Sequence, residues 1–304
     1  MHSAERSPTP VEPRPSASLI IINDRNEVLL VQRNPQARSF AGIHVFPGGN
    51  FDSAQDSSLA ITAIRETFEE SGLLIASFDS RSNCPHTLDS DTLDDARKAV
   101  HEQKLDFQSF LSDKNLKCDQ SLLHPFTTWI TPPTVARRFR TQFYVTFLSE
   151  SVQPGFSSGH KENRLPSPDG GQEVVSARFI RPDIAISEFV AHRIGLMPPQ
   201  YYVLATLSEL LHGDTTTPEQ RDKLILLSNG AFGKLTINPT IRNLPSSDWE
   251  LFIYEGDELR RGPRGRLHRA SVKRNGAVFT QIELQRNFDI FTDDVSVSST
   301  NAKL

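Results

Sequence analysis

The sequence predicts a protein of the α/β class, because strand-like and helix-like segments both occur within its 304 residues. Residues 18–23 and 28–33 are rich in branched apolar side chains and flank a short polar turn, which favours two strands of a hairpin. The segment that ends at Gly72 instead carries apolar side chains at helical spacing. Residues 172–180 again have the composition of a strand, and a helix follows from about Ile184. A chain that mixes both kinds of element is typical of an α/β protein.

The composition excludes several classes of protein. A net charge of −4 argues against broad nucleic-acid binding through bulk electrostatics. Two cysteines, Cys84 and Cys118, do not form a disulfide framework, which indicates a reducing compartment. No apolar run approaches the roughly 20 residues of a membrane span, and the first residues lack a secretory apolar region. We therefore expect one large domain, or one domain with additions, and no membrane span.

Three carboxylates share one face of the helix before Gly72, because residues three and four apart are neighbours: Glu66, Glu69 and Glu70. The opposite face is an apolar stripe that can face a core, made of Ile61, Ile64 and Phe68. Crowded carboxylates repel one another, and a hard divalent cation with oxygen ligands, Mg²⁺ or Mn²⁺, neutralises them. Arg65 can also pair with Glu69 one turn on. The alternative is a solvated acidic helix face.

This stretch resembles the Nudix box: a glycine, five residues, a glutamate, seven residues, then Arg-Glu-apolar-any-Glu-Glu-any-Gly-apolar. The matching positions are Gly49, Arg65, Glu66, Glu69, Glu70, Gly72 and Leu73. The spacing from Gly49 to Arg65 is two residues longer than the standard one. Ser57 stands where the first glutamate belongs, with Asp56 beside it, and Thr67 takes an apolar position. These departures alter the loop before the helix and leave the carboxylate-bearing half intact.

The resemblance implies a Nudix α/β/α sandwich with a mixed sheet, and an enzyme that hydrolyses a diphosphate joined to another group. It implies that Glu66, Glu69 and Glu70 hold Mg²⁺ or Mn²⁺ and that Arg65 orients its neighbours. Related enzymes often place a glutamate just before a strand near the metals. Glu173 is therefore a candidate for an extra ligand or general base, and the alternative is an exposed carboxylate at a strand end.

A second resemblance lies upstream, to the coenzyme A diphosphatases among the Nudix hydrolases. Their signature is matched at Leu29, Leu30, Arg33, Arg38, Gly42, Phe46, Pro47, Gly48 and Gly49. Val31 and Asn34 depart from it. Arginine forks match phosphate oxygens, so Arg33 and Arg38 are candidate substrate-binding residues, together with the turn at Gly48 and Gly49. The alternatives are arginines in a polar surface loop and glycines that only shape a hairpin.

A third resemblance begins at Trp129-Ile-Thr-Pro and continues through Arg137-Arg138-Phe139. It is to the peroxisomal acyl-coenzyme A diphosphatase branch, in which the next residue is commonly Asp rather than Arg140. Arg137 and Arg138 are therefore candidates for binding substrate phosphates. The alternative is a strand start whose arginines pair with carboxylates.

The predicted organisation has four parts: a disordered lead at 1–16, a Nudix domain at 17–212, a C-terminal extension at 213–294 and a flexible tail at 295–304. A helical insertion is expected at about 76–125, without recognisable chemistry of its own. The last residues, Ala302-Lys303-Leu304, resemble a peroxisomal address that an import receptor reads. The resemblance therefore implies a peroxisomal protein, and a cytoplasmic one otherwise.

The expected substrate is coenzyme A or acyl-coenzyme A, cleaved to 3′,5′-ADP and 4′-phosphopantetheine or its acyl form. One alternative keeps the fold and changes the substrate to ADP-ribose or another nucleoside diphosphate derivative, such as a nucleotide sugar. The other alternative is a non-catalytic Nudix-fold binding module, which the altered loop before the helix would favour.

Overall fold

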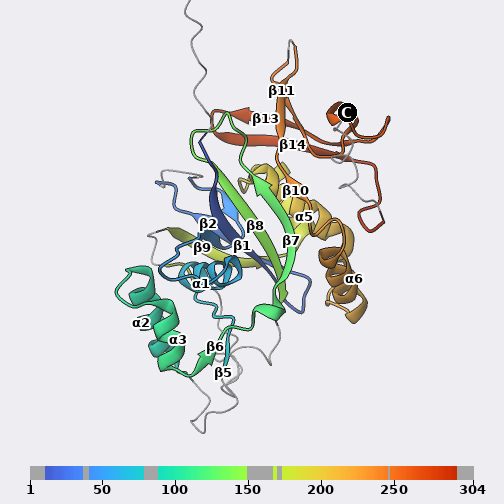
Figure 1. The fold of residues 1–304 in the computed structure, drawn as a ribbon. Coiled ribbons are helices and arrows are strands. Elements are labelled where there is room, and N and C mark those ends of the chain that lie inside the picture. The colour runs from blue at the N-terminus through green and yellow to red at the C-terminus, as the bar shows by residue number, and fades with distance from the viewer. Residues whose placement is uncertain are drawn as a thin grey trace, which may run out of the picture.

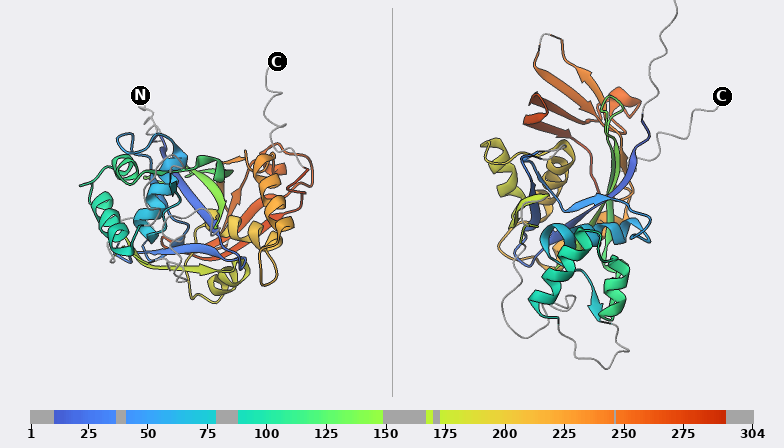
Figure 2. Two further views of the ribbon diagram at one scale, coloured as in Figure 1. Left: turned by 90° about the horizontal axis from the view of Figure 1, so that it is seen from below. Right: turned by 90° about the vertical axis from the view of Figure 1, so that its left-hand side faces the viewer.

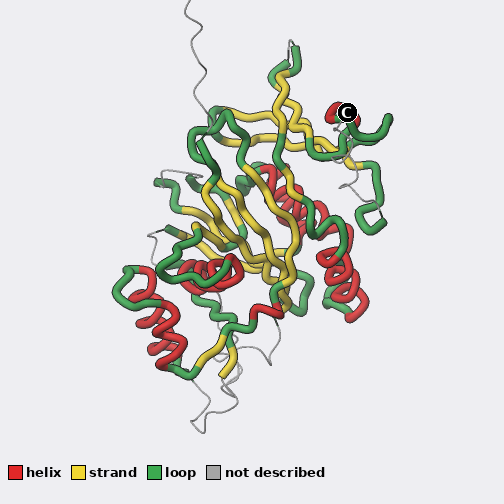
Figure 3. Tube along the Cα trace, in the orientation of Figure 1, coloured by secondary structure: helices red, strands yellow, loops and turns green. Residues whose placement is uncertain are grey.

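The computed structural model describes residues 11–36, 41–78, 88–148, 167–169, 173–245 and 247–292. Among these residues, a sheet of eight strands lies between helices on its two faces (Figure 1). Parallel and antiparallel pairs both occur in this sheet. The structure confirms the predicted α/β fold with a mixed sheet, and Figure 3 shows the strands gathered at the centre with helices around them.

The helices are α1 (Leu59–Ser71), α2 (Ser90–His101), α3 (Phe107–Asp113), α4 (Pro182–Val190), α5 (Pro198–Leu210) and α6 (Pro218–Asn229). The strands of the central sheet are β1 (Arg14–Ile22), β2 (Val28–Arg33), β3 (His44–Val45), β4 (Gly48–Asn50), β7 (His124–Ile130), β8 (Phe139–Phe147), β9 (Val174–Ile180) and β10 (Thr236–Ile237). A small pair joins β5 (Ser77–Phe78) to β6 (Leu116–Lys117). No helix in the described ranges combines the length and the apolar character that crossing a membrane requires.

Strand β1 is the spine of the sheet, because its successive side chains enter two different cores. Ile20 and Ile22 belong to the core under α4, α5 and α6, whereas Leu19 and Ile21 belong to the core under α1. The strand pairs in parallel with β8 along its whole length and meets β2 at the turn, where Ile22 faces Val28. The predicted hairpin is confirmed.

The first strand begins earlier than the sequence predicted. Strand β1 starts at Arg14, where it pairs with Phe139, although residues 1–16 were assigned to a disordered lead. Its first residues, Arg-Pro-Ser, lack the branched apolar side chains that signal a strand. Pairing with β8 and with β4, where Ser16 faces Asn50, supplies the hydrogen bonds that local preference does not predict.

The predicted helical insertion packs against the back of α1. Phe68 of α1 stacks on Phe110 of α3 at a ring distance of 5.6 Å, and Phe107 lies 6.3 Å from Phe68. Leu93 and Val100 of α2 enter the same core. The helices expected in this segment are confirmed, and Figure 2 shows them at the end of the molecule opposite the C-terminal strands.

The described residues beyond 238 form a second, four-stranded antiparallel sheet, in the order β11 (Thr240–Asn243), β12 (Trp249–Ile253), β13 (His268–Asn275) and β14 (Val278–Arg286). Strands β12 and β14 carry the aromatic and branched side chains that are typical of strands. Strand β13 reads His-Arg-Ala-Ser-Val-Lys-Arg-Asn, which lacks an apolar run. Its small apolar positions, Ala270 and Val272, are nevertheless completely buried, because they face α5 across the shared core.

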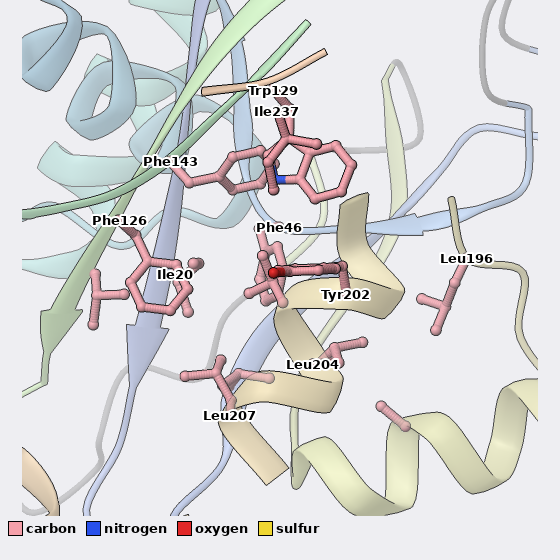
Figure 4. Packing of buried hydrophobic residues seen from close by; sticks show 14 of the residues in the cluster. Ile20, Phe46, Phe126, Trp129, Phe143, Leu196, Tyr202, Leu204, Leu207 and Ile237 are labelled. Carbon is pink, nitrogen blue, oxygen red and sulfur yellow. The ribbon is translucent and has the colours of Figure 1, made fainter. Parts of the chain in front are cut away.

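Tyr202 of α5 joins the two sheets. Its ring lies 5.3 Å from that of Trp129 on β7 and 5.7 Å from that of Tyr254 beside β12, both edge to face. Figure 4 shows it among side chains of the central sheet, with Phe46 and Trp129 close by. Its hydroxyl lies 2.8 Å from Nε2 of His268 on β13. The second sheet is therefore anchored to the core through one aromatic cluster.

His268 is held neutral in this cluster. Its Nδ1 lies 2.6 Å from the backbone oxygen of Glu255 and can only donate to it, so a neutral ring leaves Nε2 to accept from the hydroxyl of Tyr202. Burial lowers the pKa of His268 to about 4, with smaller contributions from Arg286 and Arg266. Protonation of this ring would bury a positive charge between β13 and α5 and would reverse the hydrogen bond with Tyr202.

We expect His268 to weaken the folded state as the pH falls from about 6.5 to about 4. The unfolded histidine takes up a proton in this range and the folded one does not, so the free energy of unfolding declines. A shift of this size corresponds to on the order of 3 kcal/mol once the pH reaches the folded pKa. Urea unfolding of the wild type and of His268→Gln, followed across this range, measures the effect.

Between about pH 6.5 and about pH 4, the free energy of unfolding of His268→Gln should fall less than that of the wild type. His212→Gln replaces an exposed histidine and serves as the control, which should follow the wild type. Equal pH dependence in the wild type and in His268→Gln would contradict the assignment.

Candidate functional site

Helix α1 ends at Gly72, as the sequence predicts, and is capped at its start by Ser58. The side chain of Ser58 accepts a hydrogen bond from the backbone N–H of Ile61 at 3.2 Å, which caps the first turn. Gly72 adopts the left-handed conformation, with φ of 74°, and donates its backbone N–H to the oxygen of Phe68. The apolar stripe with Ile61, Ile64 and Phe68 is buried against β1. The opposite face is therefore fixed toward the sheet edge that carries β4.

Arg65 is buried at the centre of that face, with 4% of its surface exposed. Its Nε and Nη2 donate to the two oxygens of Asp56 at 2.8 and 2.9 Å, and its Nη1 donates to Oε1 of Glu69 at 2.7 Å. Its Nη2 also lies 3.0 Å from Oε1 of Glu66. Burial alone would lower the pKa of Arg65, but the hydrogen bond with Asp56 and the charges of Glu66 and Glu69 raise it. One permanent cation therefore links three carboxylates.

Asp56 supplies the carboxylate that the box pattern lacks at Ser57. Besides Arg65, it accepts hydrogen bonds from the hydroxyl of Thr62 and the backbone N–H of Asp52, each at 2.9 Å. The longer loop thus closes on the same guanidinium through the preceding residue. The third departure, Thr67, is also accommodated, because its buried hydroxyl donates to the backbone oxygen of Ala63 at 2.7 Å. Asp56 and Thr67 are thus both hydrogen-bonded at the start and in the middle of this helix.

Glu66 and Glu70 lie directly against Gly48 and Gly49, which begin β4 and are called the glycine turn below. A β-carbon added to Gly49 would sit 2.3 Å from Cδ of Glu66, so only glycine lets that carboxylate approach the backbone. Oε2 of Glu70 accepts the backbone N–H of Gly48 at 3.0 Å. A β-carbon at Gly48 would lie 2.3 Å from the backbone oxygen of Ala17 on β1. Gly48 therefore allows the close approach of β1, whereas Gly49 allows the close approach of the Glu66 carboxylate.

The two carboxylates repel one another. Burial raises the pKa of Glu66 to about 8, aided by the charges of Glu69 and Glu173 and opposed by Arg65. Burial, and then the charge of Glu66, raises the pKa of Glu70 well above its ordinary value. Oε1 of Glu70 is buried and has no hydrogen-bond partner among the described residues. Both groups would ionise readily if a cation lay between them.

The donor set fits a hard divalent cation that the carboxylates bind and that substrate phosphates would hold more tightly. In the described part of the chain, no group of three or more His, Cys, Asp and Glu side chains is arranged to hold a metal ion by itself. Mg²⁺ usually keeps several waters and takes one or two protein carboxylates together with substrate phosphates. Glu66 and Glu70 supply two such carboxylates, and the charge of Glu173 acts on both of them.

Glu173 and Arg33 approach the same carboxylates from the sheet. Glu173 is exposed just before β9, and its backbone N–H donates to Asp169 at 2.8 Å. Nη1 of Arg33, at the end of β2, lies 3.7 Å from Oε1 of Glu70. Nε of Arg33 is buried and has no hydrogen-bond partner among the described residues. The structure therefore brings together the residues predicted on α1, β2 and β9.

Glu69 faces a different set of groups. One oxygen accepts from Arg65, and the other, Oε2, lies 3.3 Å from Nδ1 of His101 at the end of α2. Arg97, one turn earlier on α2, donates from Nε to the backbone oxygen of Glu69 at 2.8 Å. The structure thus places two side chains of the insertion, His101 and Arg97, against Glu69. Sequence analysis missed both residues, because nothing in α2 itself marks which side chains meet α1.

The other predicted substrate-binding arginines are not seen at these carboxylates. Arg138 donates from Nε to the backbone oxygen of Thr131 at 3.0 Å and from Nη1 to that of Val11 at 2.7 Å, so it ties the turn before β8 to the residues that precede β1. Arg137 is exposed on the same turn. Arg38 and the tail with Ala302-Lys303-Leu304 lie outside the described residues.

Two known proteins are similar in sequence to this chain over 60% and 66% of its length. An acyl-coenzyme A diphosphatase NUDT19 from Xenopus laevis is 26% identical over 241 residues, which cover 60% of this chain and 59% of that protein. Putative nudix hydrolase 7 from Caenorhabditis elegans is 28% identical over 210 residues, covering 66% and 62%. The match thus spans less than two thirds of the length of each of these curated relatives.

The fold and a family comparison agree with these similarities. A crystal structure of a NUDIX hydrolase from Alicyclobacillus acidocaldarius superposes with a TM-score of 0.52 at 26% identity, covering 65% of this chain and 92% of that chain. The family described as the NUDT19 Nudix domain matches residues 54–207, about half of the chain, including all of α1. The chain therefore belongs to the Nudix hydrolase superfamily and, within it, to the family of the NUDT19 Nudix domain.

Proposed function

We propose that this protein is a metal-dependent Nudix hydrolase that cleaves the diphosphate of coenzyme A or acyl-coenzyme A. Its products would be 3′,5′-ADP and 4′-phosphopantetheine or its acyl form. The observation that carries the proposal is the pair Glu66 and Glu70, two mutually repelling carboxylates that lie against Gly49 and Gly48, with Glu70 buried and Glu66 14% exposed. The choice of substrate is supported by relatives named acyl-coenzyme A diphosphatase and by the signature residues around Arg33.

Nudix hydrolases generally use divalent metal ions, and the residues of this site suit one. Glu66 and Glu70 are the proposed ligands, with Glu173 as a further ligand or general base. Glu69 was grouped with them on sequence grounds, but both of its oxygens are already engaged by Arg65 and His101. We therefore assign Glu69 to holding the site together. Bound Mg²⁺ or Mn²⁺ would neutralise the charge of the transferring phosphoryl group and lower the pKa of an attacking water.

The chain itself contributes orientation and positive charge. Arg65 holds Glu66 and Glu69 in place on α1 and does not reach substrate, because its donors are occupied by carboxylates and by the backbone oxygen of Asn50. Arg33 is the proposed contact for a substrate phosphate, since its Nε is buried beside Glu70 without a hydrogen-bond partner among the described residues. Gly48 and Gly49 keep the turn close enough for Glu66 and Glu70 to converge.

The cellular setting is also a proposal. The tail Ala302-Lys303-Leu304 supports import into peroxisomes through a receptor that reads it. A peroxisomal location would bring the protein to acyl-coenzyme A esters, which fits the proposed substrate. Deleting these three residues from a fluorescent fusion would leave the protein in the cytoplasm if the tail is the address.

The identity of the products tests the proposed function. We expect coenzyme A and acyl-coenzyme A, incubated with the protein and Mg²⁺ or Mn²⁺, to yield 3′,5′-ADP and the matching phosphopantetheine by mass spectrometry. Conversion of ADP-ribose to AMP and ribose 5-phosphate, with coenzyme A left intact, would replace the substrate and keep the fold. Binding of these compounds without turnover would indicate a non-catalytic module.

Removing one proposed ligand should abolish most of the turnover. Glu70→Gln keeps the shape and the acceptor for Gly48 but loses the charge, so we expect kcat to fall by about 100-fold or more. Asp91→Asn removes an exposed carboxylate of α2 and serves as the control. Thermal unfolding confirms that both variants are folded, and unchanged kcat in folded Glu70→Gln would remove this residue from the metal site.

The two glycines of the turn should fail in different ways. In Gly49→Ala, the new β-carbon meets the flexible end of Glu66, so we expect an intact fold and a displaced carboxylate. In Gly48→Ala, it meets the backbone of β1, which cannot yield, so we expect the melting temperature to fall by about 5 °C or more. Measuring the turnover and the melting temperature of both variants separates a displaced carboxylate from a destabilised fold. An active Gly49→Ala enzyme would show that Glu66 need not lie against the turn.

A further inference from the structure

The end of helix α2 lies against the carboxylate face of α1. The helix belongs to the insertion between β5 and β6, and its buried side carries Leu93, Ala96, Arg97 and Val100. The N-cap Asp89 starts it by accepting the backbone N–H of Thr92 at 2.7 Å. His101 is its last residue, and the side chain is 15% exposed. Packing of the apolar side chains thus fixes where the ring of His101 is placed.

The ring of His101 contacts the carboxylate oxygen of Glu69 that Arg65 leaves free. Its Nδ1 lies 3.3 Å from Oε2 of Glu69, while Arg65 donates to Oε1 at 2.7 Å. The carboxylate is therefore held between a group of its own helix and a group of the insertion. With His101 removed, only Arg65 would hold Glu69, and its free oxygen could turn toward Glu66 or toward a bound cation.

Arg97 connects α2 to Ser167, which precedes β9 in the sequence. Its Nη1 and Nη2 donate to the hydroxyl and backbone oxygen of Ser167 at 3.0 and 2.8 Å. Ser167 in turn donates its backbone N–H to Ser71, the last residue of α1. Two residues further on, Asp169 accepts the backbone N–H of Glu173. Helix α2 therefore contacts both the carboxylate face of α1 and Ser167, close in sequence to the Asp169 that binds the backbone of Glu173.

The charges around His101 support this arrangement. The hydrogen bond to Glu69 and the negative charges of Glu69, Glu173 and Asp169 all favour a positive charge on the ring. The N–H of Nδ1 has a carboxylate oxygen to donate to, whichever state Nε2 is in. Partners that orient metal-site carboxylates in this way typically change metal affinity or activity by about 10- to 100-fold when they are removed.

We propose that His101 is a positioning residue of the hydrolase site, which holds Glu69 against Arg65 so that Glu66 and Glu70 remain the carboxylates that face the cation. The helical insertion is then part of the active site. This inference rests on the proposed function, because it assigns His101 to the same carboxylates. It also predicts an effect on cation binding that needs no substrate and no turnover.

Titration of the protein with Mn²⁺ alone, followed by electron paramagnetic resonance of the free ion, tests the inference. His101→Leu removes the donor, and we expect the Mn²⁺ dissociation constant to rise by about 10-fold or more. His101→Asn retains an amide donor near the position of Nδ1 and should restore most of the affinity. Lys98→Ala, an exposed change on the same helix, is the matched control and should bind as the wild type does.

The outcomes separate this inference from the proposed function. Wild-type Mn²⁺ binding that depends on His101, without turnover of any coenzyme A compound, would support the positioning role and overturn the proposed reaction. Equal Mn²⁺ affinity in the wild type and in folded His101→Leu, or no binding by either, would overturn the positioning role. Equally weak binding by the Leu and Asn variants would overturn the role of the donor. If His101→Leu does not fold, His101→Phe keeps a planar ring and replaces it in the comparison.

Discussion

The buried guanidinium of Arg65 is the interaction on which the geometry of this site depends. It holds Asp56 of the loop with two hydrogen bonds and Glu69 of its own helix with a third, and it lies 3.0 Å from Glu66. A buried charge without partners is costly, so the loop and the helix face must keep their positions for Arg65 to remain satisfied. The longer loop before α1 is tolerated because Asp56 still reaches this one group.

The same helix divides its carboxylates into two kinds. Glu69 is neutralised by groups of the protein, Arg65 on one side and His101 on the other. Glu66 and Glu70 are left close together beside the glycine turn, and burial raises both of their pKa values. Two carboxylates that repel one another bind a cation favourably, because the cation removes the repulsion between them. The fold supports this arrangement from both sides, because β1 pairs with the strand that contains Gly48 and Gly49, and the insertion contacts Glu69 through His101.

Much of the fold could be predicted from the sequence, because local signals mark it. The capped helix with Gly72, the apolar stripe and the first hairpin all follow from short-range patterns, and so does the cluster of carboxylates. The role of His101 could not be predicted, because it depends on how α2 packs against a helix some thirty positions earlier. Strand β13 was missed for a similar reason, since its polar sequence becomes a strand only between β12 and β14. Arg138 shows how tertiary contacts add to a motif, because its side chain donates to the backbone oxygens of Thr131 and Val11, which lie far apart in the sequence.

The central claim is that Glu66 and Glu70, and not Glu69, face the cation. An anomalous-difference map from crystals of this protein grown with Mn²⁺ would test it most directly. The account predicts a peak within about 2.5 Å of oxygens of Glu66 and Glu70, with Glu69 still bound to Arg65 and His101. A peak ligated by Glu69 with its contact to His101 broken, or no peak on this face of α1, would contradict it.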